Sequence, residues 1–209
     1  MGGFMSHTTA WLIRHGQSIS SLGAWSSQPN EIGLTEEGKN QALVIADQII
    51  VRPDLIISSP MQRALQTAAL TMHKWSDVPM EVWPIQEFTY LSPTKHQSKT
   101  AAERKTVIHN YWQQAIPSYC DGEDCESFAN FIYRLKRFHQ ALLNSNGFLV
   151  IFGHGQFFKA FLFGYQHGFF ATSEWMTLFR KQETAHPMLH GEIINWNSNG
   201  VYTRENSIY

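Results

Sequence analysis

The sequence predicts a three-layer α/β/α fold, in which helices cover both faces of a mostly parallel central sheet. Short runs of apolar, strand-forming residues occur at 10–13, 55–57 and 148–152, and helical patterns at 35–50 and 60–75 stand between them. The strand runs are apolar throughout, which is typical of parallel strands buried on both faces. The alternation of strand and helix indicates βαβ units.

The expected helices have recognisable starts. Thr35 is predicted to cap the first helix. The second helix is predicted to begin with a capping box of Ser59 and Gln62, with Pro60 at its first position. Its expected buried stripe turns Arg63 away from the core. The stripe consists of Leu65, Ala68, Ala69 and Met72.

The length of 209 residues fits a single α/β domain. We expect residues 1–209 to form this domain, with a lid or insertion at about 84–124. Within the lid, one helix is predicted at 101–114. A longer helix follows, whose apolar face runs from Phe128 to Leu142.

Charge and cysteine content narrow the range of partners. The 16 Lys and Arg residues balance 17 Asp and Glu residues, with no block of like charge, which argues against nucleic acid as a partner. No segment suits a membrane span or a secretory signal, and Cys120 and Cys125 are expected to be reduced thiols. We therefore expect a soluble, cytoplasmic protein with a small-molecule partner and no membrane partner, and leave a homodimer open.

Two strand runs end in similar polar sequences. The first leads into Arg14-His15-Gly16-Gln17-Ser18, and the later one leads into Gly153-His154-Gly155-Gln156. Ligands of open α/β sheets bind at the carboxyl ends of strands, so both histidines are expected to point into one crevice. A single histidine at a strand end is more often structural, whereas the pair indicates a site.

A third strand end adds Arg63, close to the start of the second helix. Arg14 and Arg63 each offer paired N–H donors to phosphate oxygens, and the helix start adds partial positive charge. The alternative for Arg63 is a surface ion pair. Two arginines and two histidines that converge on one crevice favour a phosphate pocket.

These motifs resemble those of the histidine phosphatase superfamily, also called the phosphoglycerate mutase-like family. The matching blocks beyond the first histidine motif are 33–42, 58–68, 126–128 and 152–155, in the family's order. The resemblance implies a phosphoglycerate mutase-like fold. It also implies that His15 is the phosphorylated nucleophile and that Arg14, Arg63 and His154 bind the phosphoryl group.

The resemblance suggests further site residues. Glu87 stands where the family places its proton donor, although spacing alone would equally suit an exposed loop carboxylate. Ser21 stands where the family often has an asparagine that contacts phosphate, so this contact is left to a shorter hydroxyl. Gln17 in the histidine motif and Tyr90 in the lid are further candidates for substrate contact.

The chemistry sets requirements for these groups. One nitrogen of His15 must be unprotonated, so the other is expected to donate to a nearby backbone carbonyl. The arginines disfavour protonation of His15, whereas His154 is expected to stay protonated against the phosphate. Glu87 would protonate the departing alkoxide. The scheme needs no metal and no cofactor, and the other eight histidines are expected to be structural or solvated.

The expected function is hydrolysis of a small phosphorylated metabolite through a phosphohistidine. One alternative is a mutase that moves phosphate between hydroxyls, which would need a strongly basic mouth, whereas residues 88–112 carry scattered lysines. The other alternative is a catalytically silent module that binds a phosphorylated ligand, although all five expected catalytic residues are present. The sequence does not identify the substrate.

Overall fold

The computed structural model describes residues 8–23, 26–200 and 202–205, and these contain a six-stranded sheet in the order β3-β2-β4-β1-β5-β6. The strands are β1 (Thr8–Arg14), β2 (Leu55–Ser58), β3 (Met80–Val82), β4 (Gly147–Gly153), β5 (Ile193–Asn197) and β6 (Tyr202–Glu205). The pairs β1–β4, β4–β2 and β2–β3 are parallel, and β5 and β6 join as antiparallel strands. The predicted mostly parallel sheet is confirmed, whereas the antiparallel edge was not predicted.

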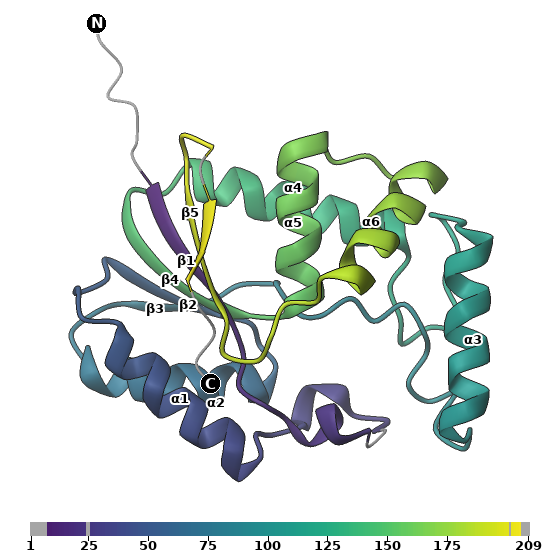
Figure 1. Ribbon diagram of the computed structural model, residues 1–209, viewed down its shortest axis with the longest axis horizontal. Helices are drawn as coiled ribbons and strands as arrows, with labels where there is room; N and C mark the ends of the chain where they lie inside the picture. The colour runs from purple at the N-terminus through teal and green to yellow at the C-terminus, as the bar shows by residue number, and fades with distance from the viewer. Residues whose placement is uncertain (1–7, 24–25, 201, 206–209) are drawn as a thin grey trace, which may run out of the picture.

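Helices cover both faces of this sheet (Figure 1). The helices α1 (Glu36–Gln48) and α2 (Gln62–Lys74) lie on one face, and α4 (Phe128–Leu143), α5 (Gly155–His167) and α6 (Ser173–Ala185) lie on the other. The helix α3 (Ala101–Gln114) stands apart from the sheet, beside α6. Two short 3₁₀ helices, η1 (Ile19–Leu22) and η2 (Pro29–Glu31), follow β1. The predicted three-layer arrangement is therefore present.

Alternate residues of the strands build two separate cores. Leu12 and Ile151 point to the face that packs on α4 and α5, in a core rich in phenylalanine. Their neighbours Ile13 and Val150 point to the opposite face, where they meet Ile45 and other residues of α1 and α2. Burial on both faces explains why these strands are apolar at every position.

Several predicted helices are confirmed in place and orientation. The Oγ1 atom of Thr35 accepts a hydrogen bond from the N–H of Gly38, as expected of the α1 cap. The predicted helix at 101–114 coincides with α3. The apolar face expected for α4 is fully buried, and it consists of Phe128, Phe131, Ile132, Leu135, Phe138 and Leu142.

The predicted start of α2 is wrong, and its buried stripe is right at Ala68 and Met72 but wrong at Ala69 and Arg63. The helix begins at Gln62 with Met61 as the cap residue, and no side chain caps it. Its buried residues are Arg63, Ala64, Thr67, Ala68 and Thr71, whereas Ala69 is exposed. The helix is rotated relative to the prediction because Arg63 and Thr67 point into the loop that carries His15, with which both form hydrogen bonds.

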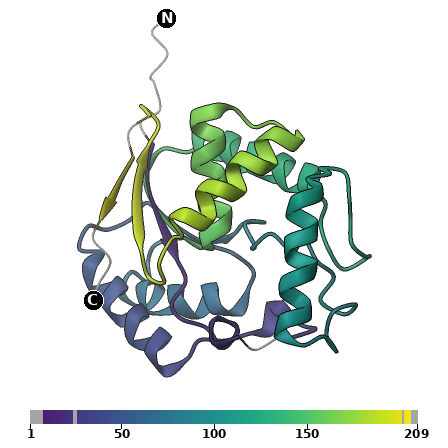
Figure 2. The same cartoon turned by 45° about the vertical axis from the view of Figure 1, so that its right-hand side comes forward.

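The segment between β3 and α4 packs against the upper layer of helices (Figure 2). Trp112 of α3 contacts Phe128 of α4 and Phe179 of α6, with ring centroids 6.2 and 6.3 Å apart. The carboxylate of Asp121 holds the two ends of the segment together, because it accepts hydrogen bonds from the Ser92 N–H, from Lys95 and from His96.

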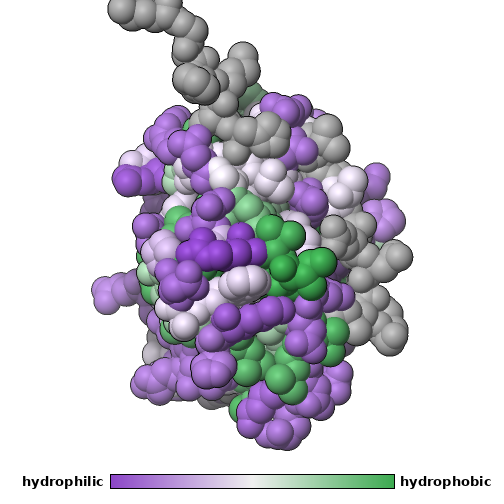
Figure 3. Space-filling view, turned by 90° about the vertical axis from the view of Figure 1, so that its left-hand side faces the viewer, coloured by the Kyte–Doolittle hydropathy of each residue, from purple (hydrophilic) through white to green (hydrophobic). Residues whose placement is uncertain are grey.

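The outer surface of the protein carries both hydrophobic and hydrophilic residues. Figure 3 shows small groups of hydrophobic residues among hydrophilic ones on the face at the left of Figure 1. Ile50 and Val51, just after α1, are 78% and 61% exposed. Within the described residues, none of the helices combines the length and apolar character that crossing a bilayer requires.

Candidate active site

The register of the sheet brings three strand ends to one level. Arg14 of β1 pairs with Gly153 of β4, and Ser58 of β2 pairs with Phe152 of β4. The residues that follow, His15, Ser59 and His154, therefore leave the sheet side by side at its carboxyl edge. The two histidines thus lie together at the strand ends, as the sequence predicted.

Glycine at position 16 lets the loop after β1 lie directly on α1. A Cβ atom at Gly16 would stand 2.4 Å from the backbone oxygen of Gly38. The N–H of Gly16 donates to Oγ1 of Thr67 at 3.1 Å. The close neighbour of this glycine is thus another backbone segment, and the loop that bears His15 is fixed from both α1 and α2.

His15 is held as a neutral imidazole. Its Nδ1 lies 2.7 Å from the carbonyl oxygen of Gly16, and its Nε2 lies 3.1 Å from Nε of Arg63. A guanidinium only donates hydrogen bonds, so Nε2 carries no proton and Nδ1–H donates to the carbonyl. Burial and the nearby Arg63 cation hold the pKa of His15 well below its usual value. The structure thus has the hydrogen bond that nucleophilic attack requires, with the lone pair on Nε2.

Two arginines flank this imidazole. Arg63 is buried and also donates from Nη1 to the backbone oxygen of Pro29 at 2.9 Å. Arg14 donates from Nη1 to the backbone oxygen of Met188 and from Nη2 to Nε2 of His190. A Cβ atom at Gly155 would lie 3.1 Å from Cδ of Arg14, so this glycine leaves room for the arginine.

His154 lies on the other side of His15, and their ring centroids are 5.1 Å apart. Its Nε2 is 2.8 Å from Oγ of Ser59, and its buried Nδ1 has no partner among the described residues. Burial, followed by the Arg63 cation, holds the pKa of His154 well below its usual value. In the protein by itself His154 is therefore favoured in its neutral form, and its protonation against a bound phosphate stays a prediction. A bound phosphate would act in the opposite direction.

Glu87 closes the site at the start of α5. Its Oε1 atom accepts a hydrogen bond from the N–H of Phe157 at 3.1 Å. Burial raises the pKa of Glu87, and the positive charges of Arg14 and Arg63 only partly oppose this effect. A carboxyl that is protonated more readily than usual and lies close to both arginines is suited to donate a proton. It is not the exposed loop carboxylate of the alternative interpretation.

The three remaining candidates for substrate contact are Gln17, Ser21 and Tyr90, and each has different neighbours. The side-chain oxygen of Gln17 accepts a hydrogen bond from Thr35 at 2.9 Å, so it ties the loop to α1. The hydroxyl of Ser21 lies 2.9 Å from Nε2 of His190. Tyr90 lines a cleft beside Glu87. Substrate contact by these three residues stays a prediction.

His190 lies beside the His15 cluster, a position that the sequence analysis did not predict when it grouped His190 with the structural or solvated histidines. Its ring centroid lies 5.7 Å from that of His15. Burial and then the Arg14 cation lower the pKa of His190 to about 4. It belongs to the turn before β5, which reaches the site because β5 runs antiparallel to β1, with Ile193 opposite Ile13. The apolar residues of β5 were the one signal in the sequence that could have placed His190 near His15.

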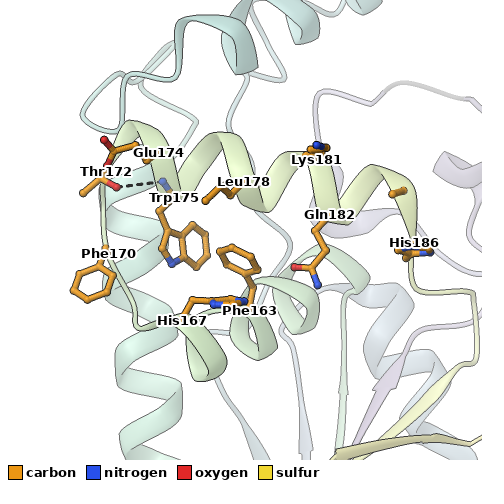
Figure 4. Close-up of a pocket in the computed structure, with 11 residues that line it drawn as sticks. Phe163, His167, Phe170, Thr172, Glu174, Trp175, Leu178, Lys181, Gln182 and His186 are labelled. Atoms are coloured by element: carbon orange, nitrogen blue, oxygen red, sulfur yellow. Dashed lines mark hydrogen bonds between the residues drawn. The ribbon is translucent and has the colours of Figure 1, made fainter.

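A separate apolar groove of about 610 Å³ lies between α5 and α6 (Figure 4). Its walls include Phe163, Trp175 and Leu178, and the N–H of Trp175 donates to Oγ1 of Thr172 at 3.2 Å. None of the residues at the carboxyl edge of the sheet lines this groove. The candidate site is therefore the cluster around His15.

The fold and this cluster have the features that phosphoryl transfer requires. A neutral imidazole with an unprotonated Nε2, two guanidinium groups and a readily protonated carboxyl together meet the needs of that chemistry. Residues 10–186 match the histidine phosphatase superfamily, branch 1. The chain belongs to this family.

Individual relatives of this chain have low sequence identity to it. The adenosylcobalamin/alpha-ribazole phosphatase of Salmonella typhimurium is 29% identical over 134 residues, which cover 61% of this chain and 63% of that protein. The structure of the alpha-ribazole phosphatase from Shigella flexneri is 24% identical with a TM-score of 0.64 and 94% of each chain covered. A mycobacterial glucosyl-3-phosphoglycerate phosphatase is 20% identical with a TM-score of 0.69, covering 94% of this chain and 96% of its own. These two structures share the fold.

Proposed function

We propose that this chain is a phosphomonoester hydrolase that acts through a phosphohistidine at His15. The observation that carries the proposal is the pair of hydrogen bonds on the His15 ring, from Nδ1 to Gly16 and from Arg63 to Nε2. They fix one tautomer and place the Nε2 lone pair against the Nε–H of Arg63, which a bound phosphate would take over. A phosphate bound there by Arg14 and Arg63 would meet the nucleophile directly.

In the first half-reaction, the lone pair on Nε2 of His15 attacks phosphorus and forms a P–N bond. The bond between phosphorus and the ester oxygen breaks, and the proton of the Glu87 carboxyl passes to that oxygen, so that a neutral alcohol leaves. Arg14 and Arg63 stabilise the negative charge on the transferring oxygens, and the buried Nδ1 of His154, which has no partner among the described residues, is the third group assigned to them.

In the second half-reaction, the Glu87 carboxylate takes a proton from water, whose oxygen attacks phosphorus. The P–N bond breaks, its electrons return to Nε2, and inorganic phosphate leaves. Glu87 is again protonated and His15 is again neutral. Water is the acceptor in this proposal because the two hollows that Glu87 lines are open to solvent.

The substrate in this proposal is a small phosphorylated metabolite. The Salmonella relative is named for adenosylcobalamin and alpha-ribazole, and the mycobacterial structure for glucosyl-3-phosphoglycerate. We also propose that the protein works in the cytoplasm. Cys120 and Cys125 are free thiols with their sulfur atoms 3.2 Å apart, a pair that an oxidising compartment would join.

Rapid quenching during turnover of p-nitrophenyl phosphate tests the proposal. Mass spectrometry under alkaline conditions is expected to find phosphate on His15. The His15→Ala variant is expected to lose the label and at least 1000-fold in turnover, because loss of a nucleophile typically removes several orders of magnitude. The matched control is His73→Ala, since His73 lies exposed on α2. Turnover by His15→Ala within tenfold of the wild type would refute covalent catalysis.

A further inference from the structure

The reacting centre opens into a cleft that selects the alcohol part of the substrate. The cleft has a volume of about 210 Å³, and Arg63 and Glu87 both line it. In the proposed function, on which this inference rests, Glu87 protonates the ester oxygen, so that oxygen faces Glu87. The alcohol part of the ester therefore extends into this cleft.

The walls of the cleft are largely apolar. Phe88 and Leu91 are 3% and 6% exposed, and the ring centroids of Phe88 and Tyr90 are 5.4 Å apart. Ile32 and Ile108 line the cleft as well, Ile108 from the lid helix α3. A flat or aliphatic group that enters between these side chains would leave water for an apolar surface, which stabilises the complex.

The charged groups near the cleft are mostly negative. A neighbouring hollow of about 440 Å³ shares Glu87 and Pro29 with the cleft, and its lining also includes Glu31, Asp124 and Glu126. The Glu126 carboxylate is neutralised by an ion pair with Arg134, so Glu31 and Asp124 carry the negative charge of this hollow. Among the described residues that line either space, Arg63 is the one cation. Two of its nitrogens already bond His15 and the backbone of Pro29. A negatively charged group on the alcohol would thus meet carboxylates and no available cation.

We propose that the substrate is a monoester of an uncharged alcohol with an apolar ring or chain, which packs against Phe88, Tyr90 and Ile108. Monoesters with a carboxylate or a second phosphate beside the ester are poor substrates, because like charges repel across the low-dielectric walls of the cleft. The same charge distribution disfavours the bisphosphate that a mutase must hold.

Three alkyl phosphates with a primary ester oxygen test this selection on the wild-type protein. Benzyl phosphate carries an apolar ring, ethyl phosphate a small neutral group, and phosphoglycolate a carboxylate. We expect kcat/KM to fall at least tenfold from benzyl to ethyl phosphate, and at least tenfold again to phosphoglycolate. Inhibition by inorganic phosphate reports the reacting centre independently of the cleft.

Two charge-matched variants of α3 locate the effect. Ile108→Lys places a cation in the cleft and is expected to lower kcat/KM for benzyl phosphate about tenfold and to raise it for phosphoglycolate at least threefold. Thr106→Lys adds the same charge at an exposed position of the helix and is expected to leave both values within twofold. Circular dichroism and an unchanged inhibition constant for inorganic phosphate check that Ile108→Lys is folded. The wild-type series decides the proposal even if this variant does not fold.

The outcomes separate the two proposals. Phosphoglycolate hydrolysed as fast as benzyl phosphate, with phosphate found on His15, would overturn the apolar selection and leave the hydrolase intact. Failure to phosphorylate His15 from any of the three esters would overturn the proposed function, and the cleft assignment with it.

Discussion

Nε2 of His190 accepts a hydrogen bond from Nη2 of Arg14 at a distance of 3.0 Å. The contact joins residues 176 positions apart in the chain, and the same turn binds Arg14 through its backbone as well. Gly191 donates to the Arg14 carbonyl, and the Arg14 N–H donates to the carbonyl of Glu192, both at 3.1 Å. The turn before β5 therefore fixes the direction of the Arg14 guanidinium beside His15.

Replacement of His190 by Ala is expected to lower kcat/KM for a good substrate by 10- to 100-fold, because Arg14 loses a partner that orients it. The inhibition constant for vanadate should rise in parallel, while the melting temperature stays within about 3 °C of the wild type. His190→Gln keeps an acceptor oxygen and is expected to recover most of the loss. An Ala variant that binds vanadate as tightly as the wild type would show that His190 does not position Arg14.

Replacement of Glu87 by Gln is expected to reduce single-turnover hydrolysis of ethyl phosphate far more than that of p-nitrophenyl phosphate, whose phenolate leaves with little help. In the wild type, hydrolysis of ethyl phosphate should decline as pH rises through the pKa of Glu87, which burial raises above its usual value. The decline reflects loss of the protonated form of the Glu87 carboxyl. The Glu87→Gln variant has no such group and should not show the decline. Equal losses on both esters would assign Glu87 to binding alone.

The imidazole of His15 is expected to remain neutral, with its proton on Nδ1, when pH falls to 5.5. Burial and the Arg63 cation lower the pKa of His15, so protonation should begin only well below the usual range. Long-range ¹⁵N–¹H spectra distinguish the two tautomers and the cation. Arg63→Met removes the neighbouring charge, and the midpoint of the His15 titration should then move upward. An imidazolium signal from His15 at pH 5.5 in the wild type would contradict this assignment.

Replacement of Gly16 by Ala is expected to lower the free energy of unfolding by about 1–3 kcal/mol, the usual cost of overpacking. The added Cβ would stand 2.4 Å from the backbone oxygen of Gly38, which cannot move without shifting α1. Gly33→Ala is the control, because its Cβ would meet only the side chain of Gln66, at 3.0 Å. Urea denaturation of the three proteins measures the difference, and equal midpoints for both variants would refute the close packing of the two segments.

Replacement of Asp121 by Asn is expected to lower the free energy of unfolding by about 1–3 kcal/mol at pH 7, because the buried carboxylate is lost as a charged acceptor for the half-exposed Lys95 and for His96. Burial alone would raise the pKa of Asp121, but hydrogen bonds from Lys95, Ser92 and His96 hold it below its usual value. The stabilisation is thus present above about pH 4 and lost as pH falls through the lowered pKa. The difference between variant and wild type should shrink when urea denaturation is repeated at pH 3. A difference that persists unchanged there would mean that packing, and not charge, links the ends of the lid.

The sequence by itself determined the layers of the fold and the main residues of the site. Fully apolar strand runs required a sheet covered on both faces, and this was enough to place His15 and His154 at neighbouring strand ends. The helix α3 and the buried face of α4 were predicted equally well, because helical periodicity and capping are local properties of the chain.

Only the tertiary structure decided the start of α2, the role of Ser59 and the place of His190. Ser59 has the sequence of a helix cap, yet its hydroxyl contacts the His154 ring, since the register of β2 and β4 brings the two residues to the same level. His190 reaches Arg14 because β5 returns antiparallel to β1. Contacts of this kind depend on which strands become neighbours, and that choice comes from packing of the whole core, not from any pattern near the residues themselves.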